Sequence, residues 1–284
     1  MQRRRLLEPQ RSLLALWARR LAIFSIPVVL LAIVIARAGS FDIQPALVTF
    51  GAGLGLAIIA ILLAIAALVM IWIDGRAGAG SAFAAIAISL LLLAYPAYLG
   101  TKAYRLPTIN DVTTDPNDPP RLEAAQRLRT RAANSTTYPG PAFYQKQTVA
   151  YPDVAPLSLD VPPQVAYDTA YSVVTKRKWA IVDARPPQAN REGIIQAVAR
   201  TPIMGFRDDV VLRVRPAGAG SRIDARSASR YGIHDFGANA TRLIALLSDI
   251  DDAVPATSPT EAPSKKPQKQ PAKPAFRPAQ PARR

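Results

Sequence analysis

The sequence predicts an α+β protein in which three N-terminal transmembrane helices precede a helix–four-strand antiparallel sheet–helix domain. Three observations lead to this prediction. Three stretches in the N-terminal third are long, apolar and uncharged. The stretch FRDDVVLRVR, residues 206–215, alternates between two faces as a half-buried strand does. Apolar residues at positions 236, 240, 243, 247 and 250 recur every three or four residues, which is the spacing of one helical face.

The uncharged stretches are Leu21–Ala36, Ile43–Ile73 and Ala77–Thr101. A helix that crosses a bilayer needs about 20 apolar residues, which the second and third stretches supply. The first is shorter and contains Pro27, but Leu13–Trp17 and arginines that snorkel to the interface can extend it. We therefore expect a basic N-terminus over residues 1–20 and a membrane domain over residues 21–101.

The distribution of arginines predicts the orientation. Six arginines precede the first span, whereas the loops hold only Arg37 and Arg76. The positive-inside rule then places the N-terminus in the cytoplasm, and three crossings place everything after Thr101 in the periplasm. A rival interpretation makes the first stretch a signal peptide cleaved near Ala36-Arg37-Ala38. It leaves the C-terminal domain on the same side of the inner membrane.

A glycine-rich motif, GAGLG, occupies residues 51–55. It opens an apolar helix instead of following a strand, so a dinucleotide-binding loop is disfavoured. The same residues form a GxxxG pattern, which allows helices to approach closely in lipid. We expect helix packing within the chain, with a homo-oligomer contact through Gly51 and Gly55 as the alternative.

The net charge of +15 lies mainly at the two ends of the chain, because residues 151–254 hold thirteen basic and twelve acidic side chains. The part able to fold in water therefore lacks the basic footprint of a nucleic-acid-binding module. Cysteine is absent, which excludes disulfides and thiolate sites. Asp208 and Asp209 are neighbours on one strand and point to opposite faces, so they cannot share a metal ion. We expect no metal, cofactor or nucleic acid.

The proline-rich segment over residues 102–163 is expected to be extended, with one local helix over 121–131, and to wrap the following domain. That domain spans residues 164–254. Its expected elements are a helix over 164–176, strands over 178–184, 193–201, 206–215 and 222–230, and a helix capped by Asp235. The tail over residues 255–284 is basic and rich in proline, alanine and lysine, and we expect it to be disordered.

The third and fourth strands form a hairpin across the turn PAGAGS. Pairing Arg215 with Arg222 places Leu212 opposite Ala225. The same register places Arg213 opposite Asp224 on the outer face, which is a favourable pair of opposite charges. A slip by one residue would set apolar side chains against charged ones.

Four stretches of this region resemble a known family: LPTINDVTTDPNDPP, the tryptophan at 179, GFRDDVVLRV and DARSASRYGIHDFGANATRL. They are similar to the domain-of-unknown-function family 1499, over roughly residues 105–250. The resemblance implies a small extracytoplasmic or membrane-attached domain. It implies no reaction, because the family is uncharacterised.

A hydrolase is one hypothesis for the stretch DARSASRYGIHDFGANATRL, residues 224–243, which we call the signature region. Ser229 or Ser227, His234 and Asp208 or Asp235 supply the residue types of a Ser-His-Asp triad. No G-x-S-x-G elbow precedes a helix here. We therefore favour a structural interpretation in which the Ser229 hydroxyl bonds the Asp208 carboxylate.

An anion site at the start of the last helix is a second hypothesis, because helix N-termini bind anions. Its ligand-binding residues are Arg226, Arg230, Gly237, Asn239 and Arg242. The competing interpretation, which we favour, pairs these arginines internally with Asp224, Asp208 and Asp235. The near-neutral charge of the domain supports it.

A third hypothesis is an apolar cavity between the sheet and a helix, lined by Tyr167, Tyr171, Trp179 and Phe206. Together these features favour a non-enzymatic, membrane-anchored periplasmic domain. It would bind an envelope protein, a lipid or another small hydrophobic or anionic ligand. The alternatives are an envelope hydrolase and a structural assembly factor whose membrane helices carry the main role.

Overall fold

The computed structural model describes residues 10–39 and 43–255. The basic residues 1–9 and the tail over 256–284, for which the sequence predicts disorder, lie outside the described residues.

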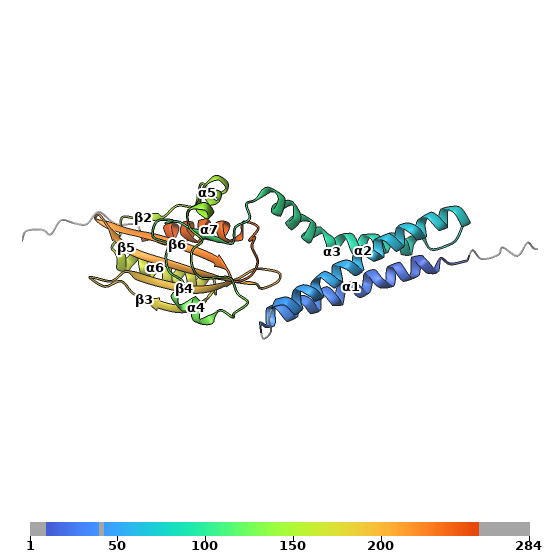
Figure 1. Cartoon of the computed structure of the whole chain (residues 1–284), viewed down its shortest axis with the longest axis horizontal. Coiled ribbons are helices and arrows are strands. Elements are labelled where there is room, and N and C mark those ends of the chain that lie inside the picture. Colours follow the sequence, from blue (N-terminus) through green and yellow to red (C-terminus); the bar gives the residue numbers. More distant parts are fainter. Residues whose placement is uncertain (1–9, 40–42, 256–284) are drawn as a thin grey trace, which may run out of the picture. The chain divides into compact units, whose positions relative to one another are not determined.

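Three helices near the N-terminus are long and apolar enough to cross a membrane, as predicted. They are α1 (Leu13–Ala38), α2 (Ile43–Asp74) and α3 (Ala79–Arg105) (Figure 1). Helix α1 begins at Leu13 because the Ser12 side chain accepts a hydrogen bond from the backbone N–H of Ala15. The first span therefore includes the extension that the sequence allows.

The three helices contact one another through alanines, which let helices approach closely in lipid. The buried residues of this cluster are Ala15, Ala18, Ala22, Ala60, Ala64, Ala67, Ala82 and Ala85. The glycine motif contributes differently from the prediction. A Cβ atom at Gly53 would lie 2.7 Å from Val29 Cγ2, whereas Cβ atoms at Gly51 and Gly55 would meet no atom within 4 Å. Packing within the chain therefore uses Gly53, and the contact between copies through Gly51 and Gly55 stays a prediction.

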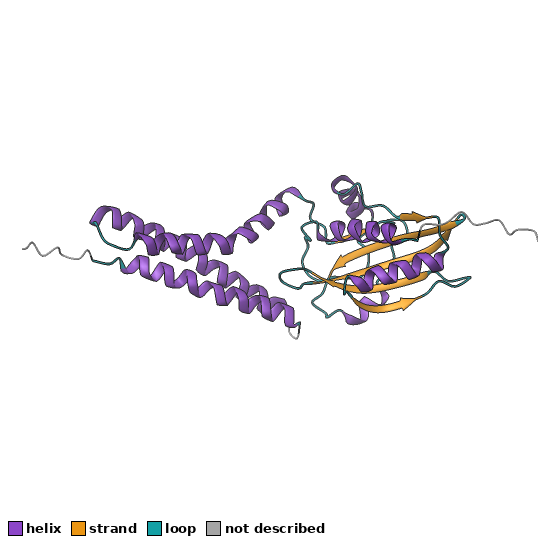
Figure 2. Cartoon of the chain, turned by 180° about the vertical axis from the view of Figure 1, so that it is seen from behind, coloured by secondary structure: helices purple, strands orange, loops and turns teal. Residues whose placement is uncertain are grey.

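The domain that follows is α+β, as predicted, with helices packed on an antiparallel sheet (Figure 2). Its elements in chain order are β1 (Asp111–Thr113), α4 (Glu123–Leu128), α5 (Pro141–Ala150), β2 (Leu157–Leu159), α6 (Pro163–Lys176), β3 (Ala180–Arg185), β4 (Gly193–Arg200), β5 (Arg207–Ala217), β6 (Gly220–Ser229) and α7 (Ala238–Ala253).

The sheet has six strands, two more than predicted, in the order β1-β6-β5-β4-β3 with β2 also paired to β6. The additional strands β1 and β2 belong to the proline-rich segment and hold three residues each. Such short strands carry too few residues to show an alternating pattern. The sequence also does not predict α5, because its prolines indicate an extended segment. Pro141 lies in the first turn of α5, where proline favours a helix instead of ending it.

The outer edge of β1 is completed by a side chain. The Gln147 amide lies on α5, donates to Thr113 O at 2.8 Å and accepts from Thr113 N at 3.1 Å. Gln147 is buried, so its amide takes the place that the next strand would have.

The predicted hairpin register is confirmed. Arg215 pairs with Arg222, Leu212 with Ala225 and Arg213 with Asp224. The strand β5 thus presents Val210, Leu212 and Val214 to one face of the sheet, where they join the main core.

The two faces of the sheet have different covers. Helices α6 and α7 lie across one face, which we call the helix-covered face (Figure 2). Its core includes Ile195, Leu212, Ile223, Leu243 and Ile250, all nearly fully buried. The opposite side, which we call the outer face, is covered in part by the segment around α4.

The last helix begins two residues later than predicted. Gly237 is its N-cap residue and has a left-handed backbone, with φ of +80°. Phe236 therefore precedes the helix, also with a positive φ of +54°. The remaining predicted positions of the apolar face, from Ala240 to Ile250, are buried as expected.

Candidate functional site

The signature residues meet where β6 ends and α7 begins, on the helix-covered face. Ser227 and Ser229 come from β6, and Asn239 and Arg242 lie one turn apart on α7. Asp208 at the start of β5 pairs with Ser229 across the strands. The alternation of strands and the helical spacing of three thus bring these five side chains together.

Each polar group in this cluster has a partner within it. Arg242 donates to Asp208, to the Ser227 hydroxyl at 2.9 Å and to Asn239 Oδ1 at 2.6 Å. Asn239 Nδ2 donates to the Ser229 hydroxyl at 3.0 Å. Asp208 therefore binds Arg242, and Ser229 finds its partner in Asn239 instead of the expected Asp208.

Asp235 caps α7 from two residues before the N-cap position. Its carboxylate accepts from the backbone N–H of Gly237 at 2.9 Å and of Asn239 at 3.0 Å. Burial raises the pKa of Asp235, and the two N–H groups only partly offset this effect. The donors that an anion would use at this helix N-terminus are thus held by a carboxylate of the chain.

Gly237 allows the left-handed backbone conformation at the start of α7. Its φ of +80° is a conformation that glycine adopts without strain. A Cβ atom there would lie 3.2 Å from Leu106 Cδ1 and 3.4 Å from the Tyr151 hydroxyl, so the chain itself fills this space.

His234 has backbone partners at both ring nitrogens. Nδ1 accepts from the backbone N–H of Phe236 at 2.9 Å, and Nε2 lies 3.3 Å from Leu106 O. An unprotonated Nδ1 and a protonated Nε2 satisfy both contacts. Among the described residues, no hydrogen bond joins His234 to Ser227 or Ser229, so the triad hypothesis lacks the contact between base and nucleophile.

Arg226 and Arg230 lie on the outer face, away from Asn239 and Arg242. Arg226 makes a two-pronged contact with Asp111, at 2.9 and 2.7 Å. Arg230 binds Asp209, which also receives Arg129 at 2.8 Å. The arginines are thus paired internally, as the favoured interpretation has it, but mostly with carboxylates other than those named from the sequence.

A second group of ion pairs surrounds Asp224, whose side chain is fully buried. Arg213, Arg215 and Arg222 each donate to it, at 3.2, 2.6 and 2.8 Å. The same three guanidinium groups contact Asp115, and two of them contact Asp118. The predicted pair of Arg213 and Asp224 is therefore part of a network closed by the proline-rich segment.

The ion pairs of this network shift the pKa of Asp115. Burial alone would raise the pKa of Asp115, but the Asp118 backbone N–H and the three guanidinium groups outweigh it and lower the pKa. At Tyr138, burial and the nearby Asp111 carboxylate raise the pKa to about 12, although Arg226 opposes them. The Arg226 guanidinium lies over the Tyr138 ring, 5.4 Å from its centroid.

Sequence reasoning missed the carboxylates Asp111, Asp115, Asp118 and Asp209 as partners. One signal could have found the first three: three arginines on one strand face need acids opposite, and the segment NDVTTDPNDPP supplies three aspartates. Among the described residues, no group of three or more His, Asp and Glu side chains is placed to hold a metal ion.

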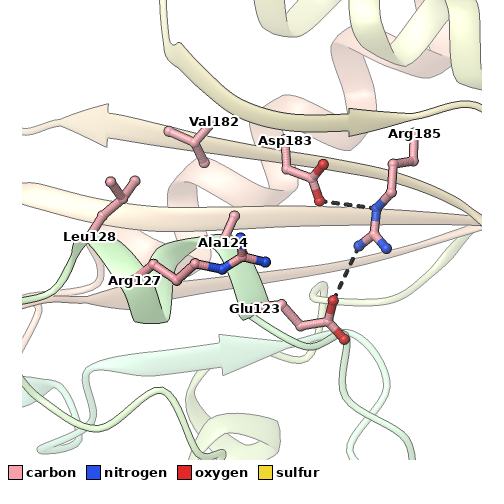
Figure 3. A pocket seen from close by; sticks show the side chains of 7 residues that line it. All are labelled: Glu123, Ala124, Arg127, Leu128, Val182, Asp183 and Arg185. Carbon is pink, nitrogen blue, oxygen red and sulfur yellow. Dashed lines mark hydrogen bonds and ion pairs between the residues drawn. The ribbon is translucent and has the colours of Figure 1, made fainter.

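Among the pockets of the described residues, three are lined in part by residues of the outer face. The first, of about 480 Å³, lies between α4 and β3 and is lined by charges of both signs (Figure 3). In it, Arg185 contacts Glu123 at 3.3 Å and Asp183 at 3.1 Å. A smaller pocket of about 200 Å³ is bordered by Ser229, Asn110 and Asn134, among others.

The remaining pocket has about 430 Å³ and a different character; we call it the basic pocket. Its apolar lining comes from Leu128, Trp179, Ala180 and Val198. Its cationic lining comes from Arg177, Lys178, Arg200, Arg207 and Arg230. Of the aromatic residues expected to line a cavity, only Trp179 borders one of these three pockets, while Tyr167 belongs to the main core.

Residues 111–250 match the family described as "Protein of unknown function (DUF1499)". They form a DUF1499 domain. The match begins at β1 and ends inside α7, so the DUF1499 domain includes the short strands of the proline-rich segment. The resemblance seen in the sequence is confirmed, while α1–α3 lie outside it. A comparison with curated proteins finds no match to this chain.

Proposed function

We propose that the protein is anchored in the inner membrane by three spans, with its N-terminus in the cytoplasm and its DUF1499 domain in the periplasm. There the domain binds an envelope partner or a small hydrophobic or anionic ligand without transforming it. One observation carries this proposal. The signature hydroxyls, amide and imidazole are bonded to other parts of the domain, while pockets lined by charged side chains open elsewhere on its surface.

The orientation rests on the concentration of arginines before the first span. It is testable because the chain contains no cysteine, so an introduced one is the only thiol. Lys146→Cys places a thiol on α5 of the domain, and Asp74→Cys places one at the end of α2; both positions are exposed. A maleimide that cannot cross membranes should label the first variant in intact spheroplasts and the second only after permeabilisation. The opposite pattern would refute the orientation.

Binding is tested by native mass spectrometry of the full-length chain, released from nanodiscs made directly from its own membrane. We expect a retained mass on the chain that mild activation removes. Labelling with a fluorophosphonate serine probe tests the alternative that the domain is a hydrolase, with Ser229→Ala as the control. Labelling that disappears in Ser229→Ala, together with a chain that carries no added mass, would overturn the binding function.

A further inference from the structure

The basic pocket differs from its neighbour in charge balance. The pocket between α4 and β3 holds two arginines and two acids, with Arg185 bonded to both acids (Figure 3). The basic pocket has five cationic lining residues, and none of its lining residues, all within the described chain, is acidic. Both pockets share Leu128, so the contrast arises between adjacent parts of one face.

Two of the five cations are matched by carboxylates that lie outside the lining. Arg230 binds the buried Asp209, and Arg177 contacts Asp249 at 2.6 Å. The other three cations, Lys178, Arg200 and Arg207, form no ion pair among the described residues. Arg200 donates to the carbonyl oxygen of Arg37 at 3.0 Å, and Arg207 donates to that of Gly39 at 3.5 Å, both at the C-terminal end of α1. These oxygens carry no full charge, and each guanidinium group has further N–H donors. The pocket therefore keeps an excess of positive charge.

The backbone at Lys178 supports a role for its side chain. Lys178 follows the C-cap of α6 with a left-handed φ of +56°. Glycine is the residue that usually takes this position, because a side chain there is strained. The backbone conformation by itself would favour glycine, and a lysine there adds positive charge to the lining of the pocket.

The lining of the pocket also includes a guanidinium group held by an aromatic ring and several apolar side chains. The Arg177 guanidinium lies over the Trp179 ring, 5.3 Å from its centroid, and Trp179 packs against the main core. This holds Arg177 in place beside the pocket. Val198 and Ala180 pair across β3 and β4 and form, with Leu128, an apolar part of the lining.

We propose that the basic pocket binds a phosphate-bearing ligand, with the phosphate held by Lys178, Arg200 and Arg207 and an apolar portion of the ligand against Leu128 and Val198. Guanidinium groups form charge-assisted hydrogen bonds with phosphate, which are stronger than neutral ones. A pocket of about 430 Å³ falls within the range of small-molecule sites. This proposal rests on the binding function above and names the site and the chemistry of its ligand.

Calorimetry on the full-length chain in a neutral maltoside detergent tests the proposal with three probes. They are inorganic phosphate, a water-soluble short-chain phosphatidylglycerol and the matching zwitterionic phosphatidylcholine. We expect the phosphatidylglycerol to bind, and the phosphatidylcholine to bind at least tenfold more weakly. If inorganic phosphate binds as tightly as the phosphatidylglycerol, the ligand is a soluble phosphate compound and the lipid chains contribute nothing.

The variant Lys178→Asn/Arg200→Gln should weaken binding about tenfold or more, because two cations are lost while asparagine tolerates the left-handed backbone. The control Lys146→Gln/Arg191→Gln removes two exposed charges outside the pocket and should leave the affinity within about twofold. Arg200→Lys, which keeps the charge, should retain most of the affinity.

Equal binding by the pocket variant and the control, or no binding of either anionic probe, would overturn the site. If the native mass spectrum still shows a different retained ligand in that case, the binding function stands and only the pocket assignment fails. If the chain retains nothing and the probes also fail, both proposals fall.

Discussion

The two faces of the DUF1499 sheet bury mainly different kinds of side chain, aliphatic on one face and charged on the other. The helix-covered face buries mainly aliphatic side chains such as Leu212 and Ile223 under α6 and α7, with the Asp208–Arg242 pair at one end. The outer face buries ion pairs of arginine and aspartate beneath the proline-rich segment, beside a smaller aliphatic cluster that includes Leu122 and Val211. Aliphatic burial needs no partner, whereas each buried charge needs a specific partner. The comparison shows why the proline-rich segment, which supplies Asp111, Asp115 and Asp118, is part of the domain.

The largest effect is expected from removing a shared carboxylate of the outer face. Asp209 is fully buried and binds both Arg129 and Arg230. Asp209→Ala leaves two buried guanidinium groups without a counter-ion, which should lower the free energy of unfolding by about 3–5 kcal/mol. Hydrogen exchange of β5 and β6 amides in the full-length chain gives this quantity. A loss below about 1 kcal/mol would show that water replaces the carboxylate.

The matched change on the helix-covered face is Leu212→Ala. Leu212 is nearly fully buried, and its loss leaves a cavity that the surrounding side chains fill only in part. We expect a loss of about 3 kcal/mol by the same measurement. The two variants should respond differently to their neighbours. Arg230→Met should recover part of the loss in Asp209→Ala and none of the loss in Leu212→Ala.

Acid should act on the two faces with opposite signs. The pKa of Asp115 on the outer side is lowered in the folded state, so its contribution is present above its usual pKa of 3.8 and is lost as the pH falls below it. The pKa of Asp235, which caps α7, is raised, so it lowers stability as the pH rises above 3.8.

Hydrogen exchange between about pH 3 and pH 6, corrected for intrinsic rates, separates these contributions. Asp115→Asn should remove a gain of stability with rising pH, and Asp235→Asn should remove a loss. The same slope in both variants would contradict the assignment of opposite shifts.

The smallest effect is expected at the surface, where neither kind of burial operates. The Asp249 side chain that meets Arg177 is 55% exposed. Asp249→Asn should change the free energy of unfolding by less than about 1 kcal/mol, and the change should disappear in high salt. A larger loss that resists salt would mean that Asp249 supports Trp179 through Arg177.

The elements that bury aliphatic side chains could be predicted from the sequence, whereas most ion pairs of the outer face could not. The spans follow from the length of their apolar stretches. Helix α6, strands β3–β6 and the register that pairs Arg213 with Asp224 follow from apolar periodicity, because burial of one face leaves a period in the chain. The strands β1 and β2 and the partners of Arg226 and Arg230 do not. Three-residue strands and ion pairs between distant segments leave no period.

At the candidate site, the sequence predicts which kinds of residue gather but not which side chains bond to one another. The sequence indicates that serines, an amide and arginines gather near the start of α7, and the structure brings Ser227, Ser229, Asn239 and Arg242 together. It does not indicate that Lys178, Arg200 and Arg207 meet in one pocket, since they come from a helix end and two strand ends. Only the sheet topology brings these positions together.

The pairing of β1 with β6 has a consequence for biogenesis. The strand β1 follows closely after α3, whereas β6 is nearly the last element of the domain to be synthesised. The contacts that complete this sheet edge are therefore among the most distant in sequence, and such contacts slow folding. The proline-rich segment must remain without its final partners until almost the whole domain has left the ribosome.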